Sequence, residues 1–244
     1  MRLREAIDET ADQLDPEGDD YAMQNLILVG HSQGGLLTRM AISDSTELDY
    51  EAFGIRRPEE ADLPAEDRKA LLELLRFQPM PQVRRVVFIA TPHRGSYVAG
   101  GVLGRMGASL IDVSRRVLDV PVRALQVPIE IATTGTIPIP TPGDRIATAV
   151  DNMAPNSLFN MILAQIPMSP EVPRHSIIAV AGSGPVESGN DGVVAYESAH
   201  IESAASEIVV RSGHSVQSNP ETVAEVRRIL LEHIAETPAG SDRQ

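Results

Sequence analysis

One short stretch constrains this chain more than any other: an apolar run that leads directly into a glycine-rich turn around a serine. Residues 26–30 read Leu-Ile-Leu-Val-Gly and are bounded by polar residues and glycine, which predicts a buried strand. A helix is predicted to follow over residues 34–42. A strand that enters a helix through Gly-x-Ser-x-Gly holds its serine, here Ser32, in a tight and strained turn. We expect side chains at Gly30 and Gly34 to collide with the neighbouring helix or strand.

This turn allows two interpretations. Its serine could be a nucleophile presented at the carboxyl end of the strand, where the N–H of Gln33 could donate to a developing oxyanion. Alternatively, Ser32 could be an ordinary residue that caps the following helix.

The rest of the chain predicts an α/β fold, with a mainly parallel sheet flanked by helices. Further buried strands are predicted over 83–90, 176–181 and 207–210. Strands that alternate with helices indicate a parallel sheet covered on both faces. Other helices are predicted over 3–14 and 65–77 and in the final segment, where Asn219 can cap and Pro220 can begin the helix. The apolar stripe of that last helix is expected to be Val223, Val226, Leu230 and Ile234.

A long segment over residues 97–173 is rich in glycine, proline and threonine, with possible helices at 108–118 and 157–166. We predict that it forms a cap or lid inserted into a core made of residues 1–96 and 174–244.

Charge and composition exclude several classes of function. The 244 residues carry a formal net charge of −13, the wrong sign for binding nucleic acid, so uncharged substrates are favoured. No cysteine is present, which excludes thiolate metal sites, and no motif predicts a catalytic metal, nucleotide or other cofactor. Prolines interrupt the longest uncharged run, 152–170, so no membrane span is expected. Residues 1–15 lack the apolar core of a signal peptide, and nothing else assigns a compartment.

Two motifs carry a resemblance to a known family. Val-Gly-His-Ser-Gln-Gly-Gly at 29–35 resembles the nucleophile elbow of the α/β-hydrolase superfamily. Ala-Thr-Pro-His-Arg-Gly-Ser at 90–96 resembles the segment after the next strand in bacterial lipases, esterases and GPI-inositol-deacylase-like proteins. The resemblance covers residues 26–234 and implies a serine hydrolase that cleaves esters of small uncharged molecules or lipids. Acyltransferases and amidases occur on the same scaffold, so the fold does not settle the reaction.

The resemblance also implies the chain order nucleophile, acid, histidine. Ser32 then takes the role of nucleophile, and His214, in the loop after the last strand, that of base. Asp191, in the loop after the third strand, would orient the base. Asn-Asp-Gly is also a favoured turn sequence, and Glu187 is the rival acid.

Other residues are candidates for contact with substrate or for packing. His31 is expected to point away from Ser32, His93 to be structural or to line a pocket, and His233 to be solvated. The apolar residues of the cap could line an acyl pocket or belong to the core. The candidate substrate-binding residues are His31, His93, Leu158, Phe159 and Ile162.

The chain departs from the family pattern in one respect. The family places several strands before the elbow strand, whereas here only a helix precedes Leu26. We therefore expect the elbow strand to have an unpaired edge, which invites self-association, or Met1 not to be the natural start. A second oxyanion donor is also missing, and such a loss typically slows catalysis about a hundred- to a thousandfold. The alternative is an impaired fragment or an interaction module that keeps only the elbow.

Overall fold

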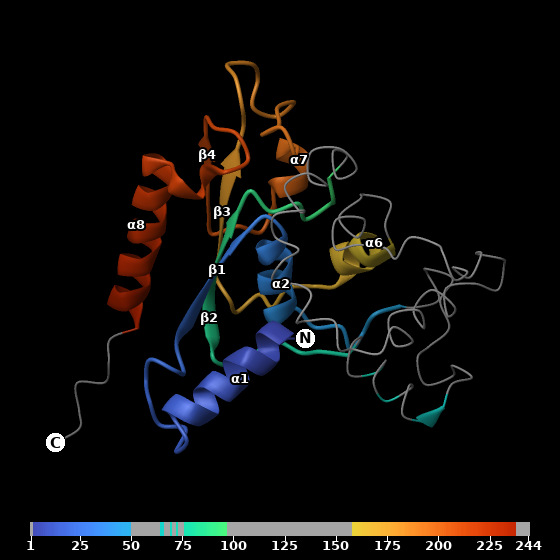
Figure 1. Ribbon diagram of the computed structural model, residues 1–244, viewed down its shortest axis with the longest axis vertical. Helices are drawn as coiled ribbons and strands as arrows, with labels where there is room; N and C mark the ends of the chain where they lie inside the picture. Colours follow the sequence, from blue (N-terminus) through green and yellow to red (C-terminus); the bar gives the residue numbers. More distant parts are fainter. Residues whose placement is uncertain are drawn as a thin grey trace, which may run out of the picture.

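The computed structural model describes residues 2–49, 64, 65, 69, 72, 76–96 and 158–237 (Figure 1). The elements in chain order are α1 (Arg2–Leu14), β1 (Leu26–His31), α2 (Gln33–Ala41), β2 (Val83–Ile89), α6 (Leu158–Gln165), β3 (Arg174–Ala179), α7 (Tyr196–Ala199), β4 (Ser206–Val210), the 3-10 helix η4 (Val216–Ser218) and α8 (Pro220–Glu236).

These bounds confirm most of the predicted elements. All four strands and the helices at α1, α2, α6 and α8 lie within about two residues of the predicted positions. Within the range 65–77, the described positions Ala65, Lys69 and Leu72 are helical, whereas Arg76 and Phe77 are not. The helix predicted over 108–118 lies outside the described residues, as does most of the predicted cap, so the division into core and cap stays a prediction.

The sheet has four strands in the order β1-β2-β3-β4, and every neighbouring pair is parallel. The predicted class, an α/β fold with a parallel sheet flanked by helices, is therefore confirmed. Within the described part of the chain β1 is an edge strand, and its residue Val29 is 47% exposed. The unpaired edge that the sequence predicts is thus present among these residues, while self-association stays a prediction.

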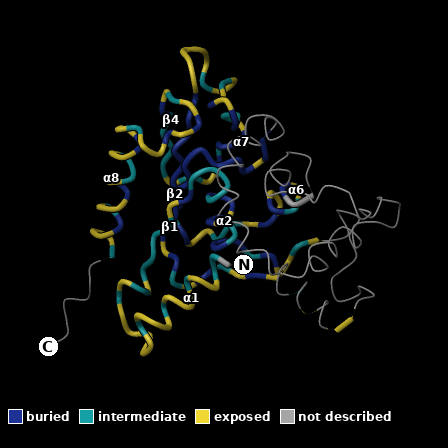
Figure 2. Tube along the Cα trace, viewed as in Figure 1, coloured by how far each residue is buried: buried dark blue, intermediate teal, exposed yellow. Residues whose placement is uncertain are grey.

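Both faces of the sheet are covered by helices, which explains why the second half of β2, Val86–Ile89, is apolar throughout. Val86 and Phe88 pack on one face with the end of α2, whereas Val87 and Ile89 pack on the other with Ile229 of α8. Figure 1 shows α2 and α8 on opposite sides of the strands. β2 and β3 are buried along almost their whole length, whereas α1 is largely exposed (Figure 2).

The apolar stripe predicted for α8 is wrong in its register. Asn219 caps the helix as expected, because its side chain accepts from the N–H of Glu221 at 2.9 Å. The face turned to the sheet, however, holds Thr222, Ile229 and His233, and Val226 packs beside them. The side chains predicted to be buried are exposed by 53%, 36% and 65% at Val223, Leu230 and Ile234 respectively.

His233 contradicts its prediction as well, since it is only 6% exposed and its Nε2 lies 3.1 Å from the carbonyl of Asn25. The reason is that α8 meets the sheet through a partly polar face, so apolar content alone does not identify the buried side.

A polar network attaches α8 to three strands. The buried Arg85 of β2 donates to Glu232 of α8 at 2.8 Å and to His175 Nε2 of β3 at 2.7 Å. Because a guanidinium can only donate, His175 Nε2 must accept, and its Nδ1–H donates to Ser206 Oγ of β4 at 2.7 Å. Burial and the nearby Arg85 lower the pKa of His175, which keeps this donor pattern intact at neutral pH.

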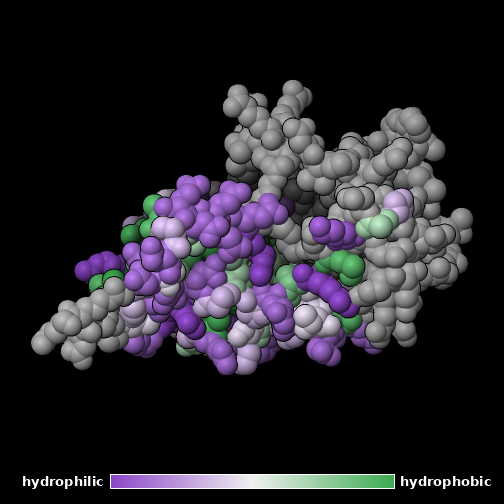
Figure 3. All heavy atoms as spheres, turned by 90° about the horizontal axis from the view of Figure 1, so that it is seen from below, coloured by the Kyte–Doolittle hydropathy of each residue, from purple (hydrophilic) through white to green (hydrophobic). Residues whose placement is uncertain are grey.

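The surface of the described residues is mainly polar, as a content of 23% charged residues leads one to expect (Figure 3). Figure 3 shows one face of the molecule, on which the described residues are mainly hydrophilic with smaller hydrophobic areas. No helix among the described residues is long and apolar enough to cross a membrane.

Candidate active site

Ser32 lies between the end of β1 and the start of α2. Its backbone conformation is one that residues other than glycine rarely adopt. Its φ is 54° and its ψ is −125°. Strain of this kind costs about 1–3 kcal/mol and persists only where the surroundings impose it. Here the Ser32 N–H donates to the carbonyl of Ile89 at 2.8 Å, and its carbonyl accepts from Gly35 at 3.0 Å. The turn is therefore held from both sides, by β2 and by α2.

Two glycines around Ser32 are required by close packing, but only one of them is a glycine for which the sequence predicted a collision. A Cβ at Gly30 would lie 2.6 Å from Gly35 Cα, which confirms the expected collision. A Cβ at Gly34 would meet no atom of the described residues within 4 Å, so the expected collision is wrong for these residues. The second essential glycine is Gly35, where a Cβ would lie 1.9 Å from Thr91 Oγ1. The close approach that requires it is between α2 and the loop after β2, which the sequence does not display.

The structure brings Ser32, His214 and Asp191 together from three distant parts of the chain. His214 Nε2 lies 2.8 Å from Ser32 Oγ, and His214 Nδ1 lies 2.8 Å from Asp191 Oδ2. The carboxylate can only accept, so Nδ1 carries the hydrogen, and Nε2 of the neutral ring accepts from the Ser32 hydroxyl. The side chains of His214 and Asp191 are 7% and 1% exposed, which shields both hydrogen bonds from water. Ser32 makes no side-chain cap bond to α2, contrary to the capping interpretation.

The Asn-Asp-Gly sequence forms a turn that also orients the Asp191 carboxylate, while the catalytic role of Asp191 stays a prediction. Its Oδ1 accepts from the N–H groups of Val193 at 2.8 Å and Val194 at 2.7 Å. Gly192 has a φ of 93°, and its N–H donates to the Asn190 side chain at 2.9 Å. With Oδ1 occupied in this way, Oδ2 is left facing His214. The rival acid, Glu187, is exposed.

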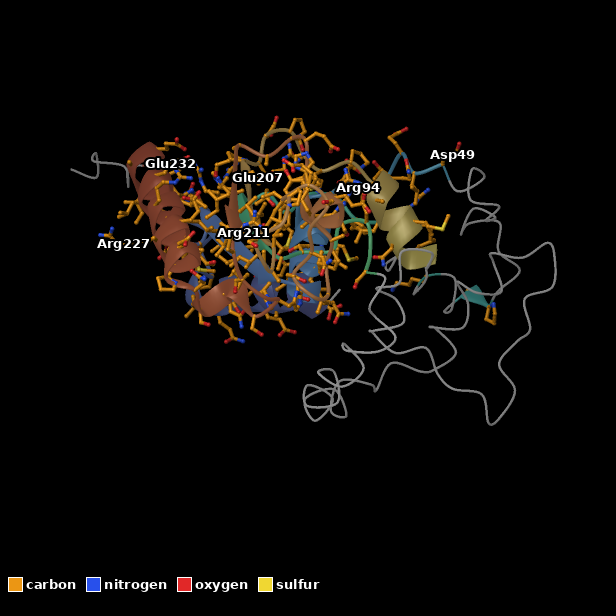
Figure 4. The ribbon with its side chains drawn as sticks, turned by 90° about the horizontal axis from the view of Figure 1, so that it is seen from above. Asp49, Arg94, Glu207, Arg211, Arg227 and Glu232 are labelled. Atoms are coloured by element: carbon orange, nitrogen blue, oxygen red, sulfur yellow. The ribbon has the colours of Figure 1, made fainter. Side chains whose placement is uncertain are left out.

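The segment at 90–96 docks the loop after β2 onto the chain that follows Asp191. Arg94 donates to the carbonyls of Glu197 at 2.6 Å and His200 at 2.5 Å, and its N–H donates to Ser198 Oγ at 3.2 Å. Ser96 Oγ donates to the carbonyl of Val193. Figure 4 shows Arg94 on the α6 side of the sheet and Arg211 nearer α8. The sequence did not predict a role for Arg94 or Ser96, although both belong to the motif at residues 90–96.

His93, a candidate for contact with substrate, is buried within the protein. It is 2% exposed, and its ring meets Phe88 edge-on at 4.6 Å between centroids. Among the described residues neither ring nitrogen has a hydrogen-bond partner. Burial, followed by the nearby charges of Arg39 and Arg94, lowers its pKa well below the ordinary value. These facts favour the structural reading, and contact with substrate stays a prediction.

Arg39 of α2 is also buried, and burial with the charges of Arg94 and Arg174 lowers its pKa to about 10. It donates to the carbonyls of Ala164 at 3.2 Å and Ile166 at 3.4 Å and so attaches the end of α6 to α2.

The apolar cap residues are only partly described. Ile162 of α6 packs, partly buried, against a core cluster that includes Leu36 and Phe77, as expected for a core residue. Nothing is described of the side chains of Leu158 and Phe159. Next to Asp191 and His214 lies a cleft of about 350 Å³, whose lining does not include Ser32 among the described residues. It is lined by Asp191, Gly192, Val193, Ser212, Gly213, His214 and Ser215. Among the described residues no cluster of three or more histidine, aspartate or glutamate side chains could hold a metal ion.

Gln33 is the first residue of α2, at the helix end where N–H groups point outward. His31, another candidate for contact with substrate, turns its ring to the His214 side, with the two ring centroids 5.1 Å apart.

The backbone of this chain is similar to that of bacterial lipases. A lipase of Bacillus licheniformis in its mature form aligns with a TM-score of 0.48 and 15% identity, over 94% of this chain and 71% of the lipase. A Staphylococcus hyicus lipase aligns at 0.45 and 11%, over 87% and 70%. EstA from Clostridium botulinum aligns at 0.47 and 10%, over 89% and 66%. No protein-family model matches the sequence, and no curated protein matches it.

Proposed function

We propose that this chain is a serine hydrolase that cleaves carboxylic esters through an acyl-enzyme on Ser32. The observation that carries the proposal is the pair of 2.8 Å contacts that links Ser32 Oγ, the His214 ring and the Asp191 carboxylate. A serine hydroxyl is a weak nucleophile at neutral pH unless an adjacent base accepts its proton. His214 Nε2 is positioned to accept that proton, and Asp191 fixes the ring in the required tautomer.

In the acylation half of the reaction, Ser32 Oγ forms a bond to the ester carbonyl carbon while its proton passes to His214 Nε2. The carbonyl oxygen takes up the negative charge, which the N–H of Gln33 at the start of α2 would stabilise. The bond to the alcohol oxygen then breaks, and His214 gives that oxygen the proton. In deacylation, water attacks the acyl carbon and loses its proton to His214, which returns it to Ser32 Oγ as the acid leaves.

The substrate is expected to be a small uncharged ester or a lipid. A formal charge of −13 disfavours the approach of strongly anionic molecules. Among the described residues that line the cleft next to Asp191 and His214 there is no lysine or arginine, so they offer no permanent positive charge to an anionic substrate.

Hydrolysis of a short p-nitrophenyl ester tests the proposal, with Ser32→Ala as the control and a fluorophosphonate label located by mass spectrometry. Turnover that is lost in Ser32→Ala, with the label on Ser32, is the expected result. Label on Ser32 without turnover would point to an impaired enzyme. Absence of both label and turnover would refute the proposal and favour an interaction module.

A further inference from the structure

The residue before Ser32 makes a contact that the proposed reaction does not yet use. His31 is the last residue of β1, paired in register with Ile89 of β2. Its Nε2 lies 2.9 Å from the backbone carbonyl oxygen of His214. Because a carbonyl oxygen can only accept, Nε2 must carry a hydrogen and donate it. Two consecutive residues of the turn therefore bond to His214: His31 to its backbone and Ser32 to its ring.

The loop that carries His214 has few other main-chain anchors. Within the described part of the chain, no backbone group of residues 212–214 is bonded to another main-chain group. Arg211, at the start of the loop, donates from its side chain to the carbonyls of Gly182 at 3.1 Å and Gly184 at 2.9 Å. The His31 contact is thus the bond that holds the backbone of His214 itself, and it comes from a strand whose position is fixed by the sheet.

We infer that His31 is a positioning residue that holds the backbone of His214 so that its Nε2 stays within hydrogen-bond reach of Ser32 Oγ; this inference rests on the proposed function. A displacement of the base by about an ångström is enough to slow such a reaction by about a hundredfold. His31 touches neither Ser32 Oγ nor the proton that moves, and it acts only through the position of His214.

The charge state of His31 agrees with this role. The pKa of His31 is lowered from its ordinary value, chiefly by burial and also by the nearby His214 ring, against the smaller raising effects of the hydrogen bond to the His214 carbonyl and of the Asp191 charge. His31 is therefore neutral at neutral pH. Its uncharged ring, 5.1 Å from that of His214, leaves His214 free to take up a proton without a like charge beside it.

Two substitutions separate the donor from the bulk of the ring. Leucine in His31→Leu fills part of the space but cannot donate, whereas the side-chain amide in His31→Gln keeps an N–H near the position of Nε2. We expect His31→Leu to lower kcat about ten- to a hundredfold with KM within about twofold, and His31→Gln to retain at least a third of wild-type kcat. His200→Leu, which removes a half-exposed histidine bonded to Glu207, is the matched control and should leave kcat unchanged. A kcat of His31→Leu within twofold of wild type would overturn the inference, as would equal losses in both His31 variants.

A second measurement does not depend on turnover. In the Ser32→Ala background, proton NMR should show a ring N–H of His31 protected from exchange and the Nδ1–H of His214 in its bond to Asp191. We expect His31→Leu to broaden or shift the His214 signal, and His31→Gln to preserve it. An unchanged His214 signal in His31→Leu would refute the positioning role. If the wild type neither turns over nor labels, the proposed function fails, and this spectrum still decides the role of His31.

Discussion

Asp191→Asn is the substitution whose effect the structure defines most sharply. Oδ1 of Asp191 accepts two backbone N–H groups, from Val193 and Val194, and Oδ2 accepts from His214 Nδ1. An asparagine has one oxygen and one NH2 group. Its oxygen must stay on the two fixed backbone donors, because the opposite orientation would set NH2 against two N–H groups. The NH2 group then faces His214 and donates to Nδ1.

This orientation forces the hydrogen of the neutral His214 ring onto Nε2, where it faces Ser32 Oγ. The ring can then no longer accept the serine proton. A base locked in the wrong tautomer costs about four orders of magnitude in kcat in a serine protease, equivalent to roughly 5 kcal/mol of transition-state stabilisation. We expect a loss of about a thousand- to ten-thousandfold here, with KM little changed.

The assay compares kcat for a p-nitrophenyl ester and the rate of fluorophosphonate labelling in wild type, Asp191→Asn and Glu187→Gln. Glu187→Gln removes the exposed acid of the same loop and should keep wild-type rates. Asp191→Asn should fold, since the bonds to Val193 and Val194 survive, whereas Asp191→Ala leaves two buried N–H groups unsatisfied at about 1–3 kcal/mol each. A folded Asp191→Asn protein with kcat within tenfold of wild type would show that the carboxylate does not set the tautomer.

Three further predictions concern stability and assembly. Gly35→Ala should lower the free energy of unfolding in urea by about 1–3 kcal/mol because its Cβ meets Thr91, whereas Gly34→Ala should change it by less than about 0.5 kcal/mol; equal effects would contradict the packing described. The pKa of His93 is lowered on folding, so the unfolded chain binds the extra proton and stability should fall with decreasing pH below the ordinary histidine value of 6.5, by up to about 1.4 kcal/mol per pH unit. His93→Leu should reduce that slope between pH 7 and 5, and an unaltered slope would disprove the assignment. If the edge of β1 drives self-association, sedimentation velocity should show a concentration-dependent dimer that Val29→Lys abolishes, and a wild type that is monomeric at every concentration would end that prediction.

The local sequence predicted the elements well where the pattern was strong. Short apolar runs identified the four described strands, because each strand contributes apolar residues to the packing between the sheet and its helices. The buried polar residues at the start of β3, such as His175, were not predicted from this pattern. The same approach failed for α8, where Val223 and Ile234 are exposed and Thr222 and His233 are buried. The difference is physical: a helix has several apolar positions to offer, and the surface that it meets selects among them.

In the candidate site, too, some features were predictable from the sequence and others were not. The turn around Ser32 is predictable from the sequence, because it is formed by consecutive residues that connect a strand to a helix. The contribution of Asp191 was predictable only as an alternative to an ordinary turn, and the structure shows that the turn and the carboxylate contact coexist.

Three features were decided by tertiary packing alone. The sequence holds no sign that Gly35 rather than Gly34 meets Thr91, that Arg94 attaches its loop to the chain after Asp191, or that His31 bonds to the backbone of His214. Each is a contact between residues more than fifty positions apart. Such distances depend on the twist of the sheet and on the exit of each loop from its strand, which a periodic pattern of residue types does not encode. The sequence by itself therefore determined which elements form and which residue types can react, and the tertiary structure decided which of those residues meet.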